Sequence, residues 1–83
     1  MQERMIRNDD HANWTIQFFE EETSTTALSI KQVDKHQDDL YTADFDDDQF
    51  TAIGDFINFF VNENNELDFD AMKKAAEFIR EQY

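Results

Sequence analysis

Hydrophobic and polar residues alternate with a period of two in three successive segments of the chain. The segments are residues 12–19, 25–33 and 40–45. In the first, Trp14 and Ile16 stand between polar neighbours, which is the pattern of a half-buried strand. Short polar stretches separate the three segments, and such connections favour antiparallel pairing of neighbours. The pattern therefore predicts a three-stranded antiparallel β-meander.

The apolar spacing changes to a helical period beyond the third segment. Phe50, Ile53 and Ile57 fall on one stripe at about 100° per residue. Asp46 offers an N-cap, and the two aspartates behind it suit the positive end of the helix dipole. We expect this first helix to continue to Val61 and to end in the asparagine-rich residues that follow, because asparagine tolerates a left-handed C-cap.

A second apolar stripe at helical spacing predicts another helix at the end of the sequence. Either Asn65 or Asp68 is a suitable N-cap for it. Strands followed by helices are typical of the α+β class, here with both helices packed on one face of the sheet. The stripe consists of Phe69, Met72, Ala76, Ile79 and Tyr83.

A single domain is expected to span residues 12–83. Residues 1–11 mix charges with isolated apolar side chains, so we expect an N-terminal arm, either loosely attached or wound into one helical turn. Gly54, the one glycine of the chain, falls inside the first predicted helix. There it costs up to about 1 kcal/mol relative to alanine. Close packing against a strand or against the second helix would explain it.

Acidic residues are concentrated in the middle of the chain. Between Asp34 and Asp70 there are twelve carboxylates and one basic side chain, Lys35, so this window carries −11 of the net charge of −13. Self-repulsion opposes compaction, and helix capping explains only a few of these acids. Carboxylates spaced along one face can imitate DNA phosphates and compete for the Lys/Arg surfaces that bind them. We interpret the acids as a surface for a basic partner.

The predicted contacts to such a partner form two charged groups and one aromatic anchor. Phe59 falls about 180° from Phe50 on a helical wheel, opposite the core stripe, and exposed aromatics are frequent binding hot spots. Packing of Phe59 on the second helix is the alternative. Phe19 has a similar place on the sheet face opposite Trp14. The first group is Asp38, Asp39, Asp44, Asp46, Asp47 and Asp48, and the second is Glu63, Glu66, Asp68 and Asp70.

The sequence lacks the residues that several kinds of metal site and catalytic site require. The 83 residues include no cysteine, which excludes disulfides and thiolate zinc sites. Asp44, Asp46 and Asp48 match the first ligand spacing of an EF-hand loop, but Gln49 stands where its sharp turn needs glycine. No glycine-rich phosphate loop, nucleophile with a histidine partner or metal-ligand spacing occurs. We expect no enzyme activity, no cofactor and no metal.

Charge and hydropathy also limit the classes of partner that the protein can bind. Seven Lys/Arg against twenty Asp/Glu leave no basic face for direct nucleic-acid binding. The longest apolar run, Phe59 to Val61, is far shorter than the ~20 residues of a membrane span. The N-terminus lacks the apolar middle region of a secretory signal. These features predict a cytoplasmic protein that does not bind membranes.

Parts of the sequence resemble small acidic DNA-mimic proteins of phages and mobile elements, including type II-A anti-CRISPR inhibitors. The similar segments are Trp14-Thr15-Ile16, Leu28 to Val33 and Phe56 to Phe60, within a likeness covering roughly residues 13–80. The resemblance implies an antiparallel meander followed by two helices, with carboxylates around the last strand and the helix joint. It further implies inhibition by occupying the PAM-reading or DNA-binding groove of a nuclease.

The sequence therefore leads to one main functional hypothesis and one alternative. The main hypothesis is an acidic, non-enzymatic binding protein, monomeric or weakly dimeric. It would block the basic nucleic-acid-binding surface of a partner protein such as a nuclease. The alternative is a small structural or housekeeping domain that dimerises through its open sheet face or edge.

Overall fold

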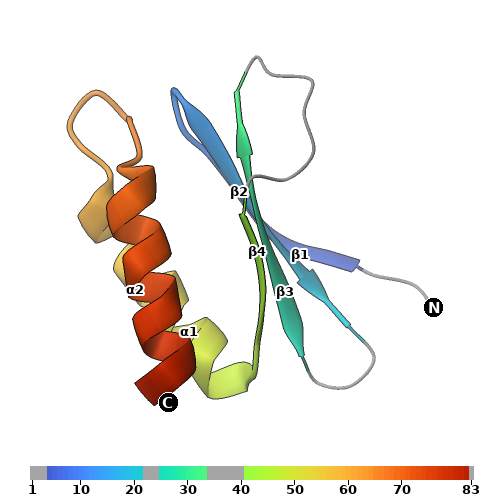
Figure 1. The fold of residues 1–83 in the computed structure, drawn as a ribbon. Helices are drawn as coiled ribbons and strands as arrows, with labels where there is room; N and C mark the ends of the chain where they lie inside the picture. Colours follow the sequence, from blue (N-terminus) through green and yellow to red (C-terminus); the bar gives the residue numbers. More distant parts are fainter. Residues whose placement is uncertain (1–3, 22–24, 34–40, 83) are drawn as a thin grey trace.

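The computed structural model describes residues 4–21, 25–33 and 41–82. Over these residues a four-stranded sheet is followed by two α-helices joined through a short 3-10 helix, and the helices lie together on one face of the sheet (Figure 1). The α+β class is thus confirmed. The elements are β1 (Arg4–Asp10), β2 (Trp14–Glu20), β3 (Thr26–Gln32), β4 (Tyr41–Phe45), α1 (Asp47–Phe56), η1 (Ile57–Phe60) and α2 (Phe69–Gln82).

The sheet contains one strand more than the sequence predicts. Residues 4–10, which we expected in an N-terminal arm, form β1 and pair antiparallel with β2, so the strand order is β1-β2-β3-β4. The pairing register shifts between Met5 and Arg7. A register shift breaks the alternation of side chains between the two faces, and β1 is an edge strand with no fully buried residue. Hydrophobic periodicity therefore gives no signal for it.

Alternate residues of the three predicted strands face the core, as their period of two predicts. Ile16 lies opposite Ile30, and Phe18 lies opposite Leu28. All four side chains are buried. Together with residues of β4 and the helices they form a single core, because alternate residues of paired strands share one face. The other contributors are Tyr41, Ala43, Phe45, Ile53, Ile57, Leu67, Met72, Ala76 and Ile79.

Helix α1 begins where predicted and ends earlier. The Asp46 carboxylate accepts a hydrogen bond from the Gln49 backbone N–H (2.8 Å), and the Gln49 side chain accepts one from the Asp46 N–H (2.9 Å). This reciprocal pair is a capping box. The chain then tightens into η1, and Val61, expected to be helical, is extended and bridges to Leu67. The predicted helix end was therefore wrong, because pairing with Leu67 competes with the helix.

Helix α2 uses the second of the two proposed caps. The Asp68 carboxylate accepts a hydrogen bond from the Ala71 N–H (3.1 Å). Asn65 instead lies in the preceding loop with a φ of 61°, a left-handed conformation that asparagine tolerates better than most residues. Met72 and Ala76 are fully buried, as the apolar stripe predicts.

Gly54 is explained by a side chain of the unpredicted strand. The Arg7 guanidinium donates to the Gly54 carbonyl (Nη1–O, 3.3 Å), pairs with Asp9 (Nε–Oδ2, 2.8 Å) and lies 5.9 Å from the Phe18 ring centroid. A Cβ on Gly54 would lie 2.8 Å from Arg7 Nη1. The close approach expected at this glycine is therefore real, and it attaches β1 to α1.

We predict that Gly54→Ala stabilises the protein more in an Arg7→Ala background than in the wild type. Alanine favours the helix by up to about 1 kcal/mol. In the wild type the new methyl group must displace the guanidinium, which offsets part of this gain. Urea unfolding of the four proteins in this double-mutant cycle measures the coupling. An equal gain in both backgrounds would show that Arg7 and Gly54 are independent.

Candidate functional site

Four exposed aspartates surround the turn from β4 into α1. We name Asp44, Asp46, Asp47 and Asp48 the junction acids. Asp44 lies on the outer face of β4, opposite Ala27 of β3. Asp46 caps α1, and the next two occupy its first turn, where the helix dipole favours negative charge. All four are exposed, so local structure gathers the charges without burying them.

A second exposed group lies at the connection between η1 and α2. We name Glu63, Glu66, Asp68 and Asp70 the loop acids. Asn62 organises this loop: its Oδ1 accepts hydrogen bonds from the backbone N–H groups of residues 64 (2.8 Å) and 66 (3.0 Å). Its Nδ2 donates to Glu66 Oε1 (3.1 Å). The loop therefore has internal bonds that fix its backbone.

The β1–β2 turn forms hydrogen bonds with the backbone of the same loop. Asn13 Oδ1 accepts a hydrogen bond from the Leu67 N–H (2.8 Å), and Asn13 Nδ2 donates to the Leu67 carbonyl (3.1 Å). The Ala12 N–H also donates to the Asn65 carbonyl (2.7 Å). Beside these bonds the Trp14 ring stacks on Phe69, with 4.4 Å between centroids. The sequence gives no local signal for this contact, because its two sides are more than fifty positions apart.

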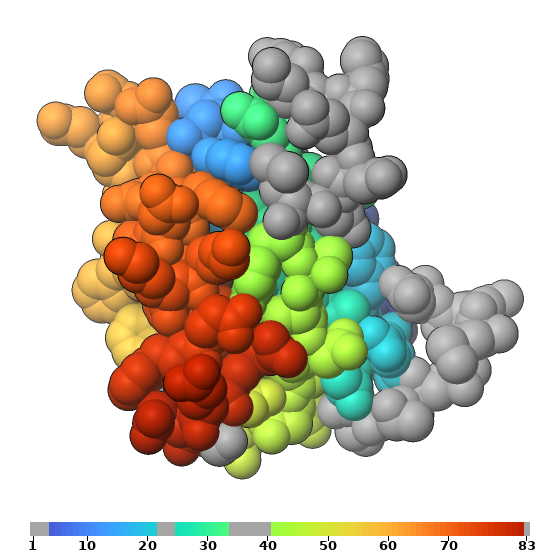
Figure 2. Space-filling view, in the orientation of Figure 1, coloured from blue at the N-terminus to red at the C-terminus, as the bar shows by residue number. Residues whose placement is uncertain are grey.

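The two acidic groups lie at opposite ends of the helical layer. In Figures 1 and 2 the yellow-green start of α1 is at the bottom and the orange loop before α2 is at the top. Helix α2 has 14 residues and so spans about 21 Å between them. The structure brings each group together but keeps the groups apart. The predicted contacts Asp38 and Asp39 lie outside the described residues.

The ion pairs among the described residues involve neither group. The ion pairs join Arg4 to Glu20 (3.1 Å), Arg7 to Asp9 (2.8 Å) and Arg80 to Glu77 (3.4 Å). Over residues 4–21, 25–33 and 41–82, none of these pairs includes a junction acid or a loop acid. The exposed carboxylates of both groups thus have no ion pair to a described base, although Asp70 shares a hollow with Lys73 and Lys74.

Phe59 is strongly exposed beside the loop acids. Its side chain is 77% exposed, and its ring contacts that of Phe56, itself 43% exposed, at a centroid distance of 5.8 Å. An open groove of about 610 Å³ borders Phe59 and the loop. Its lining residues are Asn13, Phe59, Phe60, Val61, Asn62, Glu66, Leu67, Asp68 and Ala71.

Phe56 and Phe78 are two further exposed aromatic residues. By its helical phase Phe56 falls at the edge of the first apolar stripe, a position that leaves its exposure undecided. Phe78 is 60% exposed on α2, and a helical wheel places it about 120° from the buried Met72. The helical period alone could have identified Phe78. The ring contact of Phe56 with Phe59 depends instead on how the chain tightens at the start of η1.

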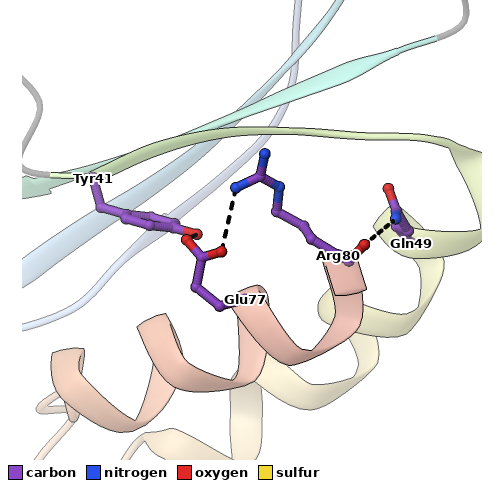
Figure 3. A network of polar contacts seen from close by, with 4 residues as sticks. All are labelled: Tyr41, Gln49, Glu77 and Arg80. Atoms are coloured by element: carbon purple, nitrogen blue, oxygen red, sulfur yellow. Dashed lines mark hydrogen bonds and ion pairs between the residues drawn. The ribbon is translucent and has the colours of Figure 1, made fainter. Parts of the chain in front are cut away.

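A polar network at the other end of the molecule joins β4 to both helices (Figure 3). The Tyr41 hydroxyl donates to Glu77 Oε1 (2.7 Å), and Arg80 pairs with Glu77 Oε2. Gln49 Nε2 donates to the Arg80 carbonyl (3.4 Å). Burial, and then the hydrogen bond to Glu77 and its negative charge, raises the pKa of Tyr41 to about 12. The network stabilises the packing of α2 near the junction acids.

Neither known proteins nor the described residues indicate a metal centre or a membrane span. No family model, curated protein or solved structure matches the chain. In the described ranges there is no cluster of three or more His, Asp or Glu side chains suited to a metal ion. Residues 47–56 are helical, so Asp44, Asp46 and Asp48 do not begin an EF-hand loop. Neither α1 nor α2 is long and apolar enough to cross a membrane.

We predict that Asn13→Ala destabilises the fold by about 1–3 kcal/mol, because it leaves both backbone groups of Leu67 without their partners. Urea unfolding measures this loss, and backbone amide chemical shifts report whether the loop acids move. Asn64→Ala is the matched control, since the exposed Asn64 takes part only through its backbone N–H. It should change stability by less than about 0.5 kcal/mol. Equal effects of the two substitutions on stability would show that the hydrogen bonds of Asn13 to Leu67 do not stabilise the fold.

We predict that stability falls between about pH 10 and pH 12 through Tyr41. Its pKa is about 12 in the folded protein and 10.0 without the fold. The stabilisation of the protonated phenol is complete below pH 10 and is lost as pH rises to the folded pKa. The loss is up to about 2 kcal/mol. Tyr41→Phe should remove this component from urea unfolding curves and from the phenolate absorbance titration. An unchanged pH dependence in Tyr41→Phe would contradict the assignment.

Proposed function

We propose that this chain is an acidic, non-enzymatic binding protein that occupies the basic nucleic-acid-binding surface of a partner protein. One observation carries the proposal: both acidic groups are exposed, unpaired with described bases and held by defined backbone. A solvated turn does not require eight carboxylates in two such groups. A partner rich in Lys/Arg would gain complementary charge from both.

The spacing of the groups suits competition with a nucleic acid. Duplex DNA advances 3.4 Å per base-pair step, so the ~21 Å between the ends of α2 corresponds to roughly six steps. Negative charge at both ends of a rigid layer can engage two basic sites that DNA otherwise bridges. Such charge accelerates encounter with the partner and makes binding weaken as salt rises.

Binding is favoured over catalysis by the surroundings of the acids. Carboxyl pairs that act as general acid and base need environments that separate their pKa values, usually through burial. The junction acids and loop acids instead lie at exposed turns and helix starts. Their arrangement supports electrostatic attraction and steric exclusion.

The specific form that we propose is inhibition of a type II-A CRISPR nuclease. The sequence resemblance motivates this choice. Such nucleases hold the guide–target duplex in a positively charged channel and read a short PAM duplex directly. An acidic protein seated there would exclude DNA, so we expect inhibition of cleavage when it is added before DNA and little inhibition when it is added after.

We predict that Asp48→Lys slows association with a guide-loaded type II-A nuclease by at least about threefold at low salt, because it reverses charge in the junction acids. Surface plasmon resonance measures the association rate constant. Asp10→Lys is the matched control, since Asp10 is exposed and lies outside both groups. It makes the same change in net charge.

The comparison separates a local contact from an effect of net charge. Equal slowing by the two substitutions would show that overall charge, rather than the junction acids, controls binding. If wild-type protein leaves cleavage unaffected at saturating concentration, the anti-CRISPR form of the proposal fails. If no salt-sensitive nucleic-acid-binding protein is captured from host lysate either, the broader form fails.

A further inference from the structure

The Phe56–Phe59 pair is an exposed apolar feature that neither core packing nor helix capping explains. Phe59 is 77% exposed and Phe56 is 43% exposed, although their rings contact each other. Other exposed large hydrophobic side chains among the described residues are Met5, Ile6 and Phe78. An aromatic pair presented at one place to solvent indicates a binding surface.

The groove beside this pair is lined by acidic residues and by no basic residue. Glu66 and Asp68 line it together with Phe59, and none of its lining residues is Lys or Arg. Asp55, which is exposed, lies four positions before Phe59. Acidic and aromatic groups thus occur together in the groove, and this combination favours a cationic occupant.

An arginine side chain combines the two properties that this groove offers to bind. Its planar guanidinium stacks on an aromatic face and pairs with a carboxylate through two parallel hydrogen bonds. A lysine ammonium is more strongly hydrated and cannot form the planar, two-bond pairing. We infer that the groove at Phe59, Glu66 and Asp68 receives an arginine side chain of the basic partner. This inference deepens the proposed function and rests on it for the identity of the partner.

Phe78 shows why exposure alone does not select this site. It is 60% exposed on α2, but the shallow hollow around it contains Lys73 and Lys74 as well as acids. The two lysines offset most of the charge of the acids there, so this hollow attracts a cation less strongly than the groove does. Phe78 therefore provides a matched aromatic control on the same helical layer.

Two peptides of equal length, one of arginine and one of lysine, test the groove without the natural partner. Calorimetric titration at low salt should show tighter binding of the arginine peptide by about two- to fivefold, the range of an exposed cation–π contact. Phe59→Ala should remove this preference while leaving lysine-peptide binding unchanged. Glu66→Gln should weaken arginine-peptide binding. Phe78→Ala should leave the preference intact.

The outcomes separate this inference from the proposed function. Equal affinity of the wild type for the two peptides overturns the arginine site, as does a preference that survives Phe59→Ala or disappears in Phe78→Ala. If the arginine site is overturned but the wild-type protein still inhibits the nuclease, the proposed function stands. A preserved arginine preference without capture or inhibition of any nucleic-acid-binding protein would instead support the groove and refute the proposed function. Amide chemical shifts of each variant confirm that it is folded.

Discussion

The side-chain amide of Asn13 provides the contact on which the geometry of the candidate interface depends. It bonds both backbone groups of Leu67, next to the stack of Trp14 on Phe69. The loop between η1 and α2 has one bridge of its own, from Val61 to Leu67, and internal bonds to Asn62, but the N–H and carbonyl of Leu67 find their partners outside the loop. The β1–β2 turn supplies those partners. The groove at Phe59 and the loop acids therefore rest on the sheet as well as on the helices.

The same acidic residues contribute to the fold and to the proposed contact surface. Asp46 and Asp68 cap α1 and α2, so each carboxylate satisfies a backbone N–H at a helix start. Capping uses a small part of each carboxylate and leaves it exposed. The dipole also favours the acids of each first turn. A chain of net charge −13 can therefore place negative charge where local structure tolerates it.

The predictable parts of this structure are those that local patterns control. Ile16, Phe18 and the other inward residues follow from alternation, and the Asp46 cap follows from its place before an apolar stripe. Strand β1 was missed because a register shift and an exposed edge remove its periodicity. The end of α1 was misplaced because Val61 pairs with Leu67, a competition that the helical stripe does not reveal.

The sequence by itself determined which alternating strand residues face the core, that α1 begins after Asp46 and that Phe59 lies away from the apolar stripe. Each of these depends on a residue and its near neighbours. Only the tertiary structure decided that the acids form two groups at opposite ends of the helical layer, and that Arg7 packs on Gly54. It also placed Phe59 beside Glu66 and Asp68. These arrangements join segments distant in sequence, so they arise from packing of the helices on the sheet.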